Sequence, residues 1–321
     1  MTKAPALSLV TTLYRSSVTL EDFIRQSVAA ARQLVGTDFE IVLVDDGSPD
    51  DSLALAKQLS ESVPQLVIVE LSRNFGHHQA LLEGMHQSRG DLVFLIDSDL
   101  EEDPRWLLDF ADEMNHADAD VVYGYQASRK GSVFERASGA LYWGMFRSLT
   151  GLHLPSNIVT CRLMTRQYVE AVLEYRENQV SIGGIFTLAG FNQKPVPVGK
   201  RDKGSSTYSL PLKMWHLINS VTSFSSKPLE LIFLIGLLTT LVGFLLIGYL
   251  VLAAVVWNQP PVGWTSVMAS LWLIGGIIIL SLGTIAIYLG KVFLEVKGRP
   301  RVLVKSKTNP RTAAMHSGEQ E

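Results

Sequence analysis

A block of sixty residues, 231–290, contains no lysine, arginine, aspartate or glutamate. At about 1.5 Å of rise per residue, the runs 231–256 and 264–290 each exceed the roughly 20 residues that a helix needs to cross a bilayer core. Between them lies Asn258-Gln259-Pro260-Pro261, a turn through which neither helix can continue. We therefore predict a C-terminal transmembrane hairpin of two helices, with a buried helical hairpin of a soluble protein as the alternative.

The charged residues on either side of this block indicate its orientation. Residues 1–230 hold 21 of the 28 Lys and Arg and 28 of the 31 Asp and Glu, whereas residues 291–321 hold 7 basic and 3 acidic residues. Lys227 precedes the first run, basic residues follow the second, and the turn between them carries no charge. Because basic residues collect on the cytosolic side of membrane helices, both flanks are expected to be cytosolic.

The chain is accordingly divided into four predicted parts. Residues 1–209 form a folded domain, 210–228 an interfacial helix and linker, 229–291 the transmembrane hairpin, and 292–321 a basic cytosolic tail. The apolar segments 138–146 and 210–221 are expected to lie on the bilayer as amphipathic helices, with core packing as the alternative. Glycines such as Gly236 and Gly243 permit close contacts between membrane helices, so a homo-oligomer is expected.

The folded domain begins with short apolar segments that alternate with helical patterns. We predict strands at 6–13, 39–44, 66–71 and 92–96, and helices at about 19–35, 51–62 and 78–87. This order predicts an α/β domain of Rossmann-like type, with a mostly parallel sheet and helices on both faces. In such sheets ligands bind beyond the carboxyl ends of the strands, so the polar residues at those ends are the candidates for function.

Paired carboxylates follow the fourth of these strands. Asp97 and Asp99 are two positions apart, and Glu101 lies two further on. In an extended segment such side chains point the same way, and their mutual repulsion favours a divalent cation. An oxygen-only site with positions left for substrate phosphates suits Mg²⁺ or Mn²⁺. The alternative is a strand end followed by a helix cap, because Asp103-Pro104 opens a helix well.

The first two strands also end in polar residues. Strand one delivers Thr12 and Tyr14 to the same edge, and strand two delivers Asp45 and Asp46. A half-buried carboxylate there can accept hydrogen bonds from a base N–H or a ribose hydroxyl. The chain has no glycine-rich phosphate loop of either common type, so phosphates would be held by the metal.

Three short motifs give these residues a family context. Val44-Asp45-Asp46-Gly47-Ser48, Arg73-Asn74-Phe75-Gly76 and Asp97-Ser98-Asp99 resemble the GT-A glycosyltransferases of family 2. Arg162-Leu163-Met164 and Arg201 with the following Gly204-Ser205-Ser206-Thr207-Tyr208 extend the match. With the hairpin, the set covers about residues 7–305 and resembles the polyprenyl-phosphate glycosyltransferases, which include dolichol-phosphate mannosyltransferase and bacterial undecaprenyl-phosphate glucosyl and aminoarabinosyl transferases.

The resemblance implies inverting transfer of a sugar from a nucleotide diphosphate sugar to a polyprenyl phosphate, at the cytosolic face of a bacterial inner membrane. Expected partners are the donor, the lipid acceptor and the bilayer, with no nucleic acid. The expected catalytic residues are Asp97, Asp99 and Arg201, and the metal ligands Asp97, Asp99 and Glu101. The expected nucleotide-binding residues are Thr12, Tyr14, Asp45, Asp46, Arg73, Asn74, His77 and Ser98. The acceptor phosphate is assigned to Arg129, Arg136, Arg201 and Lys203.

The chain also departs from the family pattern. Arg15 stands where the family usually has Asn, Glu101 where Gln is common, and Thr160 where the family often has the Asp of an Asp-Phe-Arg motif. The sequence therefore leaves open which sugar, nucleotide, lipid and glycan pathway are involved. Two other functions stay open as well: a membrane polysaccharide synthase of the same family, and a catalytically inactive membrane scaffold.

Overall fold

The computed structural model describes residues 4–126, 144, 148–149, 157–176, 182–199, 218, 221–222, 225–257 and 263–309. These residues fall into two compact units. Unit 1 draws on 1–137, 153–207 and 299–321, and unit 2 on 138–152 and 208–298. Most of the two segments predicted to lie on the bilayer, and the turn predicted at 258–261, fall outside the described residues. The division into four parts stays a prediction.

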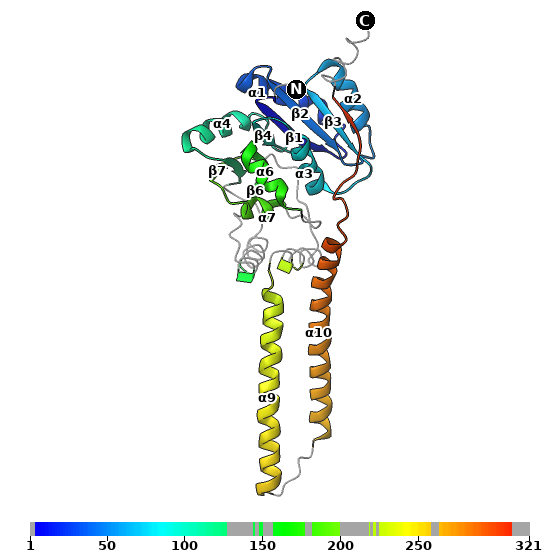
Figure 1. Cartoon of the computed structure of the whole chain (residues 1–321), viewed down its shortest axis with the longest axis vertical. Helices are drawn as coiled ribbons and strands as arrows, with labels where there is room; N and C mark the ends of the chain where they lie inside the picture. Colours follow the sequence, from blue (N-terminus) through cyan, green and yellow to red (C-terminus); the bar gives the residue numbers. More distant parts are fainter. Residues whose placement is uncertain are drawn as a thin grey trace. The chain divides into compact units, whose positions relative to one another are not determined.

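Unit 1 is built on an eight-stranded sheet of order β7-β5-β6-β4-β1-β2-β3-β8 (Figure 1). β1 pairs in parallel with β2 and β4, β2 with β3, and β5 with β7, whereas β6 and β8 run antiparallel to their neighbours. The prediction of an α/β domain with a mostly parallel sheet is confirmed. The strands are β1 Leu7–Leu13, β2 Phe39–Asp45, β3 Leu66–Leu71, β4 Leu92–Leu95, β5 Val121–Tyr125, β6 Ile158–Thr165, β7 Gln193–Pro197 and β8 Val304–Thr308.

Helices cover both faces of the sheet (Figure 1). They are α1 Leu20–Val35, α2 Ser52–Ser62, α3 His77–Gln87, α4 Trp106–Ala117, α6 Arg166–Glu174 and α7 Ile182–Leu188. On one face Phe23 of α1 and Phe110 of α4 join Leu9 and Phe94 in a buried cluster. Because the central strands are buried on both sides, they consist of continuous apolar runs rather than alternating ones.

The opposite face of the sheet is covered by α3, α6 and α7. Leu81, Tyr168 and Phe186 come from these three helices and share a second buried cluster with Val10 and Val44 of the sheet. The carboxyl ends of β1, β2 and β4 therefore emerge at one edge between two packed helix layers, and the loops that follow them carry the candidate site.

An edge strand that the sequence did not suggest lies within the predicted basic tail. β8 pairs antiparallel with β3, and the Ser72 amide donates to the Leu303 carbonyl at 2.9 Å. Glu70 of β3 accepts hydrogen bonds from Lys305 and, at 3.0 Å, from the Ser306 hydroxyl. These bonds, with Lys305 the largest influence, lower the pKa of Glu70 from 4.5 to about 2. The C-terminal strand thus closes one edge of the sheet.

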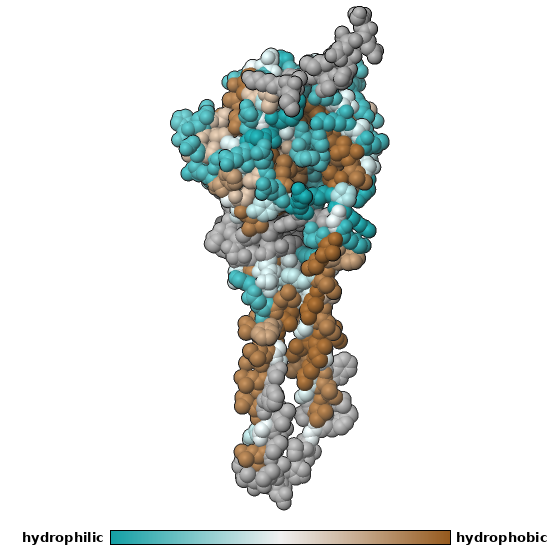
Figure 2. Space-filling model, in the orientation of Figure 1, coloured by the Kyte–Doolittle hydropathy of each residue, from teal (hydrophilic) through white to brown (hydrophobic). Residues whose placement is uncertain are grey.

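Unit 2 contains two long helices, α9 Lys227–Trp257 and α10 Trp264–Val296, which cover both predicted membrane runs. They run antiparallel and side by side (Figure 1), and exposed apolar side chains such as Leu245 and Ile279 line them (Figure 2). The Tyr288 hydroxyl of α10 donates to the Ser225 carbonyl at 2.6 Å. Within the described residues, one stretch, Leu273–Val296, is long and apolar enough to cross a membrane. The complete two-helix transmembrane hairpin stays a prediction.

Candidate active site

The paired carboxylates lie directly beyond β4. That strand ends at Leu95, and the segment after it bends into a turn rather than continuing as an extended strand. The Asp97 side chain is 21% exposed, and its buried Oδ1 atom accepts no hydrogen bond from the described residues but lies 3.4 Å from the His77 Nε2 atom. Asp99 Oδ1 accepts a hydrogen bond from the Glu101 amide at 3.0 Å. Within the described part of the chain, the site therefore offers a carboxylate oxygen that accepts no hydrogen bond and whose ion-pair partner is the His77 ring.

This donor set can be compared with the needs of a hard divalent cation. Mg²⁺ is commonly bound through one or two carboxylates, with water and substrate phosphates completing its shell. The unsatisfied Asp97 oxygen and the neighbouring Asp99 fit that requirement. Within the described residues, no group of three or more His, Cys, Asp or Glu side chains is placed to hold a metal ion. Glu101 thus does not complete such a group in the structure.

Residues of β1 and α3 meet Asp97 at this edge. The Thr12 hydroxyl lies 3.1 Å from Nδ1 of His77, the first residue of α3, so His77 is placed between Thr12 and Asp97. The Ser98 hydroxyl donates to the Thr12 carbonyl at 2.8 Å. Thr12, His77 and Ser98 were all predicted to bind the nucleotide, and the structure brings them together beside Asp97.

The Asp46 carboxylate forms hydrogen bonds to backbone amides of the protein. Its side chain is 2% exposed and accepts hydrogen bonds from the Phe75 amide at 2.7 Å and the Gly76 amide at 3.0 Å. Burial raises its pKa, against the effect of these two bonds. Next to it, Gly47 has a φ of +62°, and a Cβ there would lie 2.6 Å from the Asn74 nitrogen. Asp46 and Gly47 therefore fix the segment 73–76 against the end of β2.

Asp45 closes β2 and is 3% exposed. Burial, with a smaller contribution from Glu70, raises its pKa from 3.8 to about 6, while a hydrogen bond from the Ser48 amide at 3.3 Å opposes that shift. A carboxyl group with such a pKa exchanges its proton near neutral pH. It can accept a hydrogen bond when ionised and donate one when protonated.

The other predicted nucleotide ligands are more exposed. Tyr14 is 47% exposed, and the Arg15 guanidinium lies 5.7 Å from its ring. The Arg73 guanidinium lies 4.0 Å from the centre of the Phe75 ring, and its Nη1 donates to the Asn74 carbonyl at 2.8 Å. Tyr14 follows β1 and Arg73 follows β3, the strands on either side of β2, which ends in Asp45, so a ligand at this edge could contact both sets.

Comparison with known proteins identifies this arrangement. Residues 8–173 match the family model described as Glycosyl transferase family 2. A Mycobacterium tuberculosis protein named among the glycosyltransferases is 40% identical over 299 residues, which span 93% of this chain and 87% of that protein. The chain belongs to glycosyl transferase family 2.

This glycosyltransferase is also similar to the bactoprenol glucosyl transferase of Shigella phage SfX. The two are 28% identical over 305 residues, which span 94% of this chain and 99% of the phage protein. A solved structure, residues 1–349 of Staphylococcus aureus TarS in complex with UDP-GlcNAc, aligns with a TM-score of 0.46 at 18% identity, over 68% of this chain and 65% of that chain. The family resemblance read from the sequence motifs is confirmed.

Two acids of this glycosyltransferase hold the site together and were not predicted to do so. Glu102 is fully buried and accepts from the Asp97 amide at 3.3 Å and from the Thr160 amide at 3.0 Å, which links the Asp97 segment to β6. Asp50 accepts from the Ser17 amide at 3.2 Å and the Ser48 hydroxyl at 2.6 Å, which joins the segments that follow β1 and β2. Sequence spacing shows three consecutive acids at 101–103 but not which one turns inward.

The predicted acceptor-phosphate residues Arg129, Arg136, Arg201 and Lys203 lie outside the described residues. Their assignment, including the catalytic role given to Arg201, stays a prediction. The described part of the site thus consists of carboxylates, hydroxyls and a histidine at the carboxyl edge of the sheet.

Proposed function

We propose that this glycosyltransferase moves a sugar from a nucleotide diphosphate sugar to a polyprenyl phosphate, with inversion at the anomeric carbon. The observation that carries the proposal is the unsatisfied carboxylate oxygen of Asp97 at the carboxyl edge of the sheet, beside Asp99, Thr12 and His77. A relative named for bactoprenol, similar over 94% of the chain, supports a lipid acceptor. The apolar stretch Leu273–Val296 supports a reaction at a membrane.

Asp97 and Asp99 would hold Mg²⁺ or Mn²⁺ in this proposal. When bound, the cation would neutralise charge on the diphosphate as it leaves. Asp45, buried at the end of β2, would accept a hydrogen bond from the base or ribose of the donor. Thr12 and Ser98, tied to each other through the β1 backbone, would fix the position of Asp97 relative to β1.

The acceptor supplies its own nucleophile. The second pKa of a phosphate monoester is about 6, so a phosphate oxygen is largely ionised at neutral pH and needs no strong general base. This oxygen forms the new bond to the anomeric carbon from the side opposite the nucleoside diphosphate, whose bond to that carbon breaks. Arg129, Arg136, Arg201 and Lys203 are the cations proposed to position the acceptor.

The membrane arrangement forms part of the proposal. Helices α9 and α10 would cross a bacterial inner membrane as a hairpin, with unit 1 and the C-terminus in the cytosol. The absence of charge between residues 231 and 290 and the basic residues after it support this orientation. A homo-oligomer through the glycine-bearing helices is also proposed, and a monomeric mass in both detergent and lipid nanodiscs would contradict it.

The test is transfer by the purified full chain of radiolabelled sugar from nucleotide sugars to undecaprenyl phosphate, followed by organic extraction. Asp97→Asn should nearly abolish the lipid-linked label. Asp91→Asn, at the exposed opposite end of β4, should not and serves as the matched control. Label in a water-soluble polymer would instead indicate a polysaccharide synthase. No transfer from any nucleotide sugar would indicate an inactive scaffold.

A further inference from the structure

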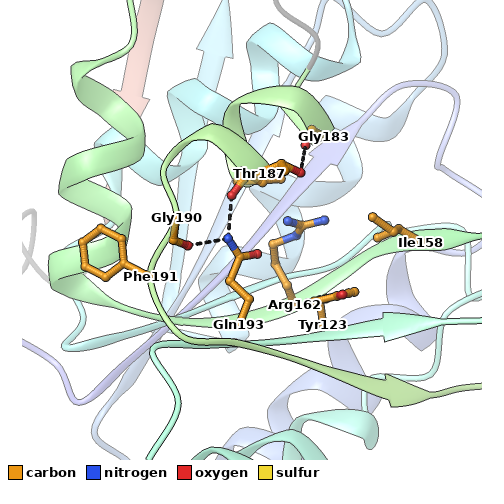
Figure 3. Close-up of a pocket in the computed structure, with 9 residues that line it drawn as sticks. Tyr123, Ile158, Arg162, Gly183, Thr187, Gly190, Phe191 and Gln193 are labelled. Carbon is orange, nitrogen blue, oxygen red and sulfur yellow. Dashed lines mark hydrogen bonds between the residues drawn. The ribbon is translucent and has the colours of Figure 1, made fainter. Parts of the chain in front are cut away.

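A pocket lies near the sheet strands that neighbour the candidate active site. It has a volume of about 250 Å³ and lies between α7 and strands β5, β6 and β7 (Figure 3). Arg162 of β6 pairs in register with Leu95, the last residue of β4, and with Tyr123 of β5. The pocket wall formed by Arg162 is therefore one strand away from the segment that carries Asp97.

Arg162 is the buried charge of this pocket. It is 5% exposed, and its guanidinium points into the space under α7 (Figure 3). It lies 3.6 Å from the centre of the Phe186 ring, and its Nε atom donates to the Thr160 carbonyl at 3.2 Å. The Tyr168 hydroxyl, which belongs to the same buried cluster as Phe186, donates to the Phe186 carbonyl at 2.9 Å and so holds that ring against Arg162. These contacts fix the guanidinium plane in one orientation.

These contacts include no ion pair, although the charge of the buried Glu102 carboxylate acts on Arg162. Among the described residues, no carboxylate forms an ion pair with Arg162, and burial lowers its pKa from 12.5 to about 10. Arg89 shows the contrast, since its guanidinium and its amide both donate to the buried carboxylate of Glu40. A guanidinium has five N–H donors. Each side-chain nitrogen of Arg162 either has a hydrogen-bond partner or is accessible from outside the protein. Its N–H groups that do not reach protein acceptors are therefore open to the pocket.

The remaining wall of the pocket is held by internal hydrogen bonds and carries a second donor, Tyr123. The Gln193 side-chain nitrogen donates to the Phe186 carbonyl at 2.7 Å and to the Gly190 carbonyl at 2.6 Å, and the Thr187 hydroxyl donates to the Gly183 carbonyl at 3.0 Å (Figure 3). The Tyr123 phenol also lines the pocket, and its raised pKa keeps it a neutral O–H donor.

We propose that this pocket binds a compact oxyanion, a phosphate monoester or a carboxylate, held by the Arg162 guanidinium with the Tyr123 hydroxyl as a second donor. The planar fork of arginine matches two oxygens of such a group, and the surrounding burial strengthens the attraction. The buried Glu102 carboxylate acts on Arg162 without forming an ion pair with it, so an anion in this pocket would supply a direct counter-charge. The pocket volume leaves room for a small organic group attached to the anion.

The inference deepens the proposed function, on which the source of the anion rests. The lipid monophosphate of the acceptor is one source, and a soluble phosphate or carboxylate compound is the other. Both present the same oxygens to Arg162, so binding can be measured before the source is known. The position next to the Asp97 segment suits a ligand that enters together with the donor.

The test titrates the full chain in detergent with inorganic phosphate at constant ionic strength, by calorimetry. The wild type should bind saturably, Arg162→Lys at least tenfold more weakly, and Tyr123→Phe about two- to fivefold more weakly. Arg166→Lys is the matched control and should bind like the wild type, because Arg166 is also partly buried but donates to the Gly90 carbonyl. No saturable binding by the wild type, or equal affinity in Arg162→Lys, would overturn the proposal.

A second variant and a competition experiment complete the test. If Arg162→Lys does not fold, Tyr123→Phe carries the test, since it removes one hydroxyl and no charge, and unchanged affinity in that variant would overturn the proposal. Competition between phosphate and a short-chain polyprenyl monophosphate in the wild type would assign the site to the lipid. Phosphate binding without that competition would assign it to a soluble anion. Because binding is measured without sugar transfer, failure of the transfer assay would leave this pocket standing.

Discussion

Replacing Asp45 by asparagine should make the ligand-free protein more stable at neutral pH while weakening its binding of the donor. The Asp45 carboxyl is 3% exposed, and burial raises its pKa from 3.8 to about 6. A group that binds its proton more tightly in the folded state contributes stability that is fully present below the unfolded pKa of 3.8 and is lost as the pH rises through 6. Above pH 6 the buried carboxylate therefore destabilises the fold.

The expected gain in stability follows from the pKa shift of Asp45. A rise from 3.8 to about 6 corresponds to about 3 kcal/mol at 1.36 kcal/mol per pKa unit. Asparagine carries no charge at any pH, but its oxygen is a weaker acceptor for the Ser48 amide than a carboxylate. The net gain for Asp45→Asn at pH 8 should therefore be about 1–3 kcal/mol, falling towards zero below about pH 4.

Hydrogen exchange of the β2 amides, in the full chain in detergent and without nucleotide, measures this gain at pH 4.5 and pH 8. Asp38→Asn is the matched control, because Asp38 is exposed and lies just before the other end of β2. Lower protection than the wild type at pH 8, or the same gain at both pH values, would refute the assignment of the pKa shift to burial. Unchanged donor affinity in Asp45→Asn would remove Asp45 from the nucleotide side of the site.

Three further variants test other parts of the structure. Glu70→Gln should raise the hydrogen exchange of the β8 amides, because it removes the charge that binds Lys305. In the wild type the stability that this contact contributes should be lost as the pH falls from 4.5 towards 2, because Lys305 lowers the pKa of Glu70. Unchanged exchange would argue against the edge contact. Gly47→Ala should destabilise unit 1 by about 1–3 kcal/mol, because φ is +62° and the new Cβ would meet the Asn74 backbone; denaturant unfolding measures this. Arg201→Lys should raise the KM for polyprenyl phosphate with little change for the donor, because lysine lacks the guanidinium fork; a change confined to donor KM would assign Arg201 to the nucleotide side.

The central sheet could be predicted because its strands are buried on both faces. Segments such as 39–44 and 66–71 are continuous apolar runs between turn residues, and the structure places β2 and β3 there. β8 was missed for the opposite physical reason. Its sequence, Val304-Lys-Ser-Lys-Thr308, is polar and largely exposed, and its pairing depends on a partner strand that the sequence order does not reveal.

The sequence predicted those parts of the candidate site that are positioned by the strand ends. It did not predict the parts that depend on the conformation of the turn after β4. The rule that ligands bind at the carboxyl edge correctly brings Thr12 and Asp97 together, with His77 between them. The expected alternation of carboxylates fails after β4, because the chain turns there and Leu100 adopts a φ of +60°. In that turn Glu102 is the acid that buries its carboxylate, which accepts from the Asp97 amide.

The position of β8 near the C-terminus also determines when the sheet can be completed during synthesis of the chain. Lys305 and Glu70, which meet across the closed edge, are 235 positions apart in the chain. At synthesis rates of about 5–20 residues per second, roughly 10–50 s pass between the emergence of β3 and that of its partner. During that interval β3 presents an unpaired edge, the kind of surface that other strands can join. Both apolar helices are translated within the same interval, so a nascent chain can complete its eight-stranded sheet only after these helices have left the ribosome.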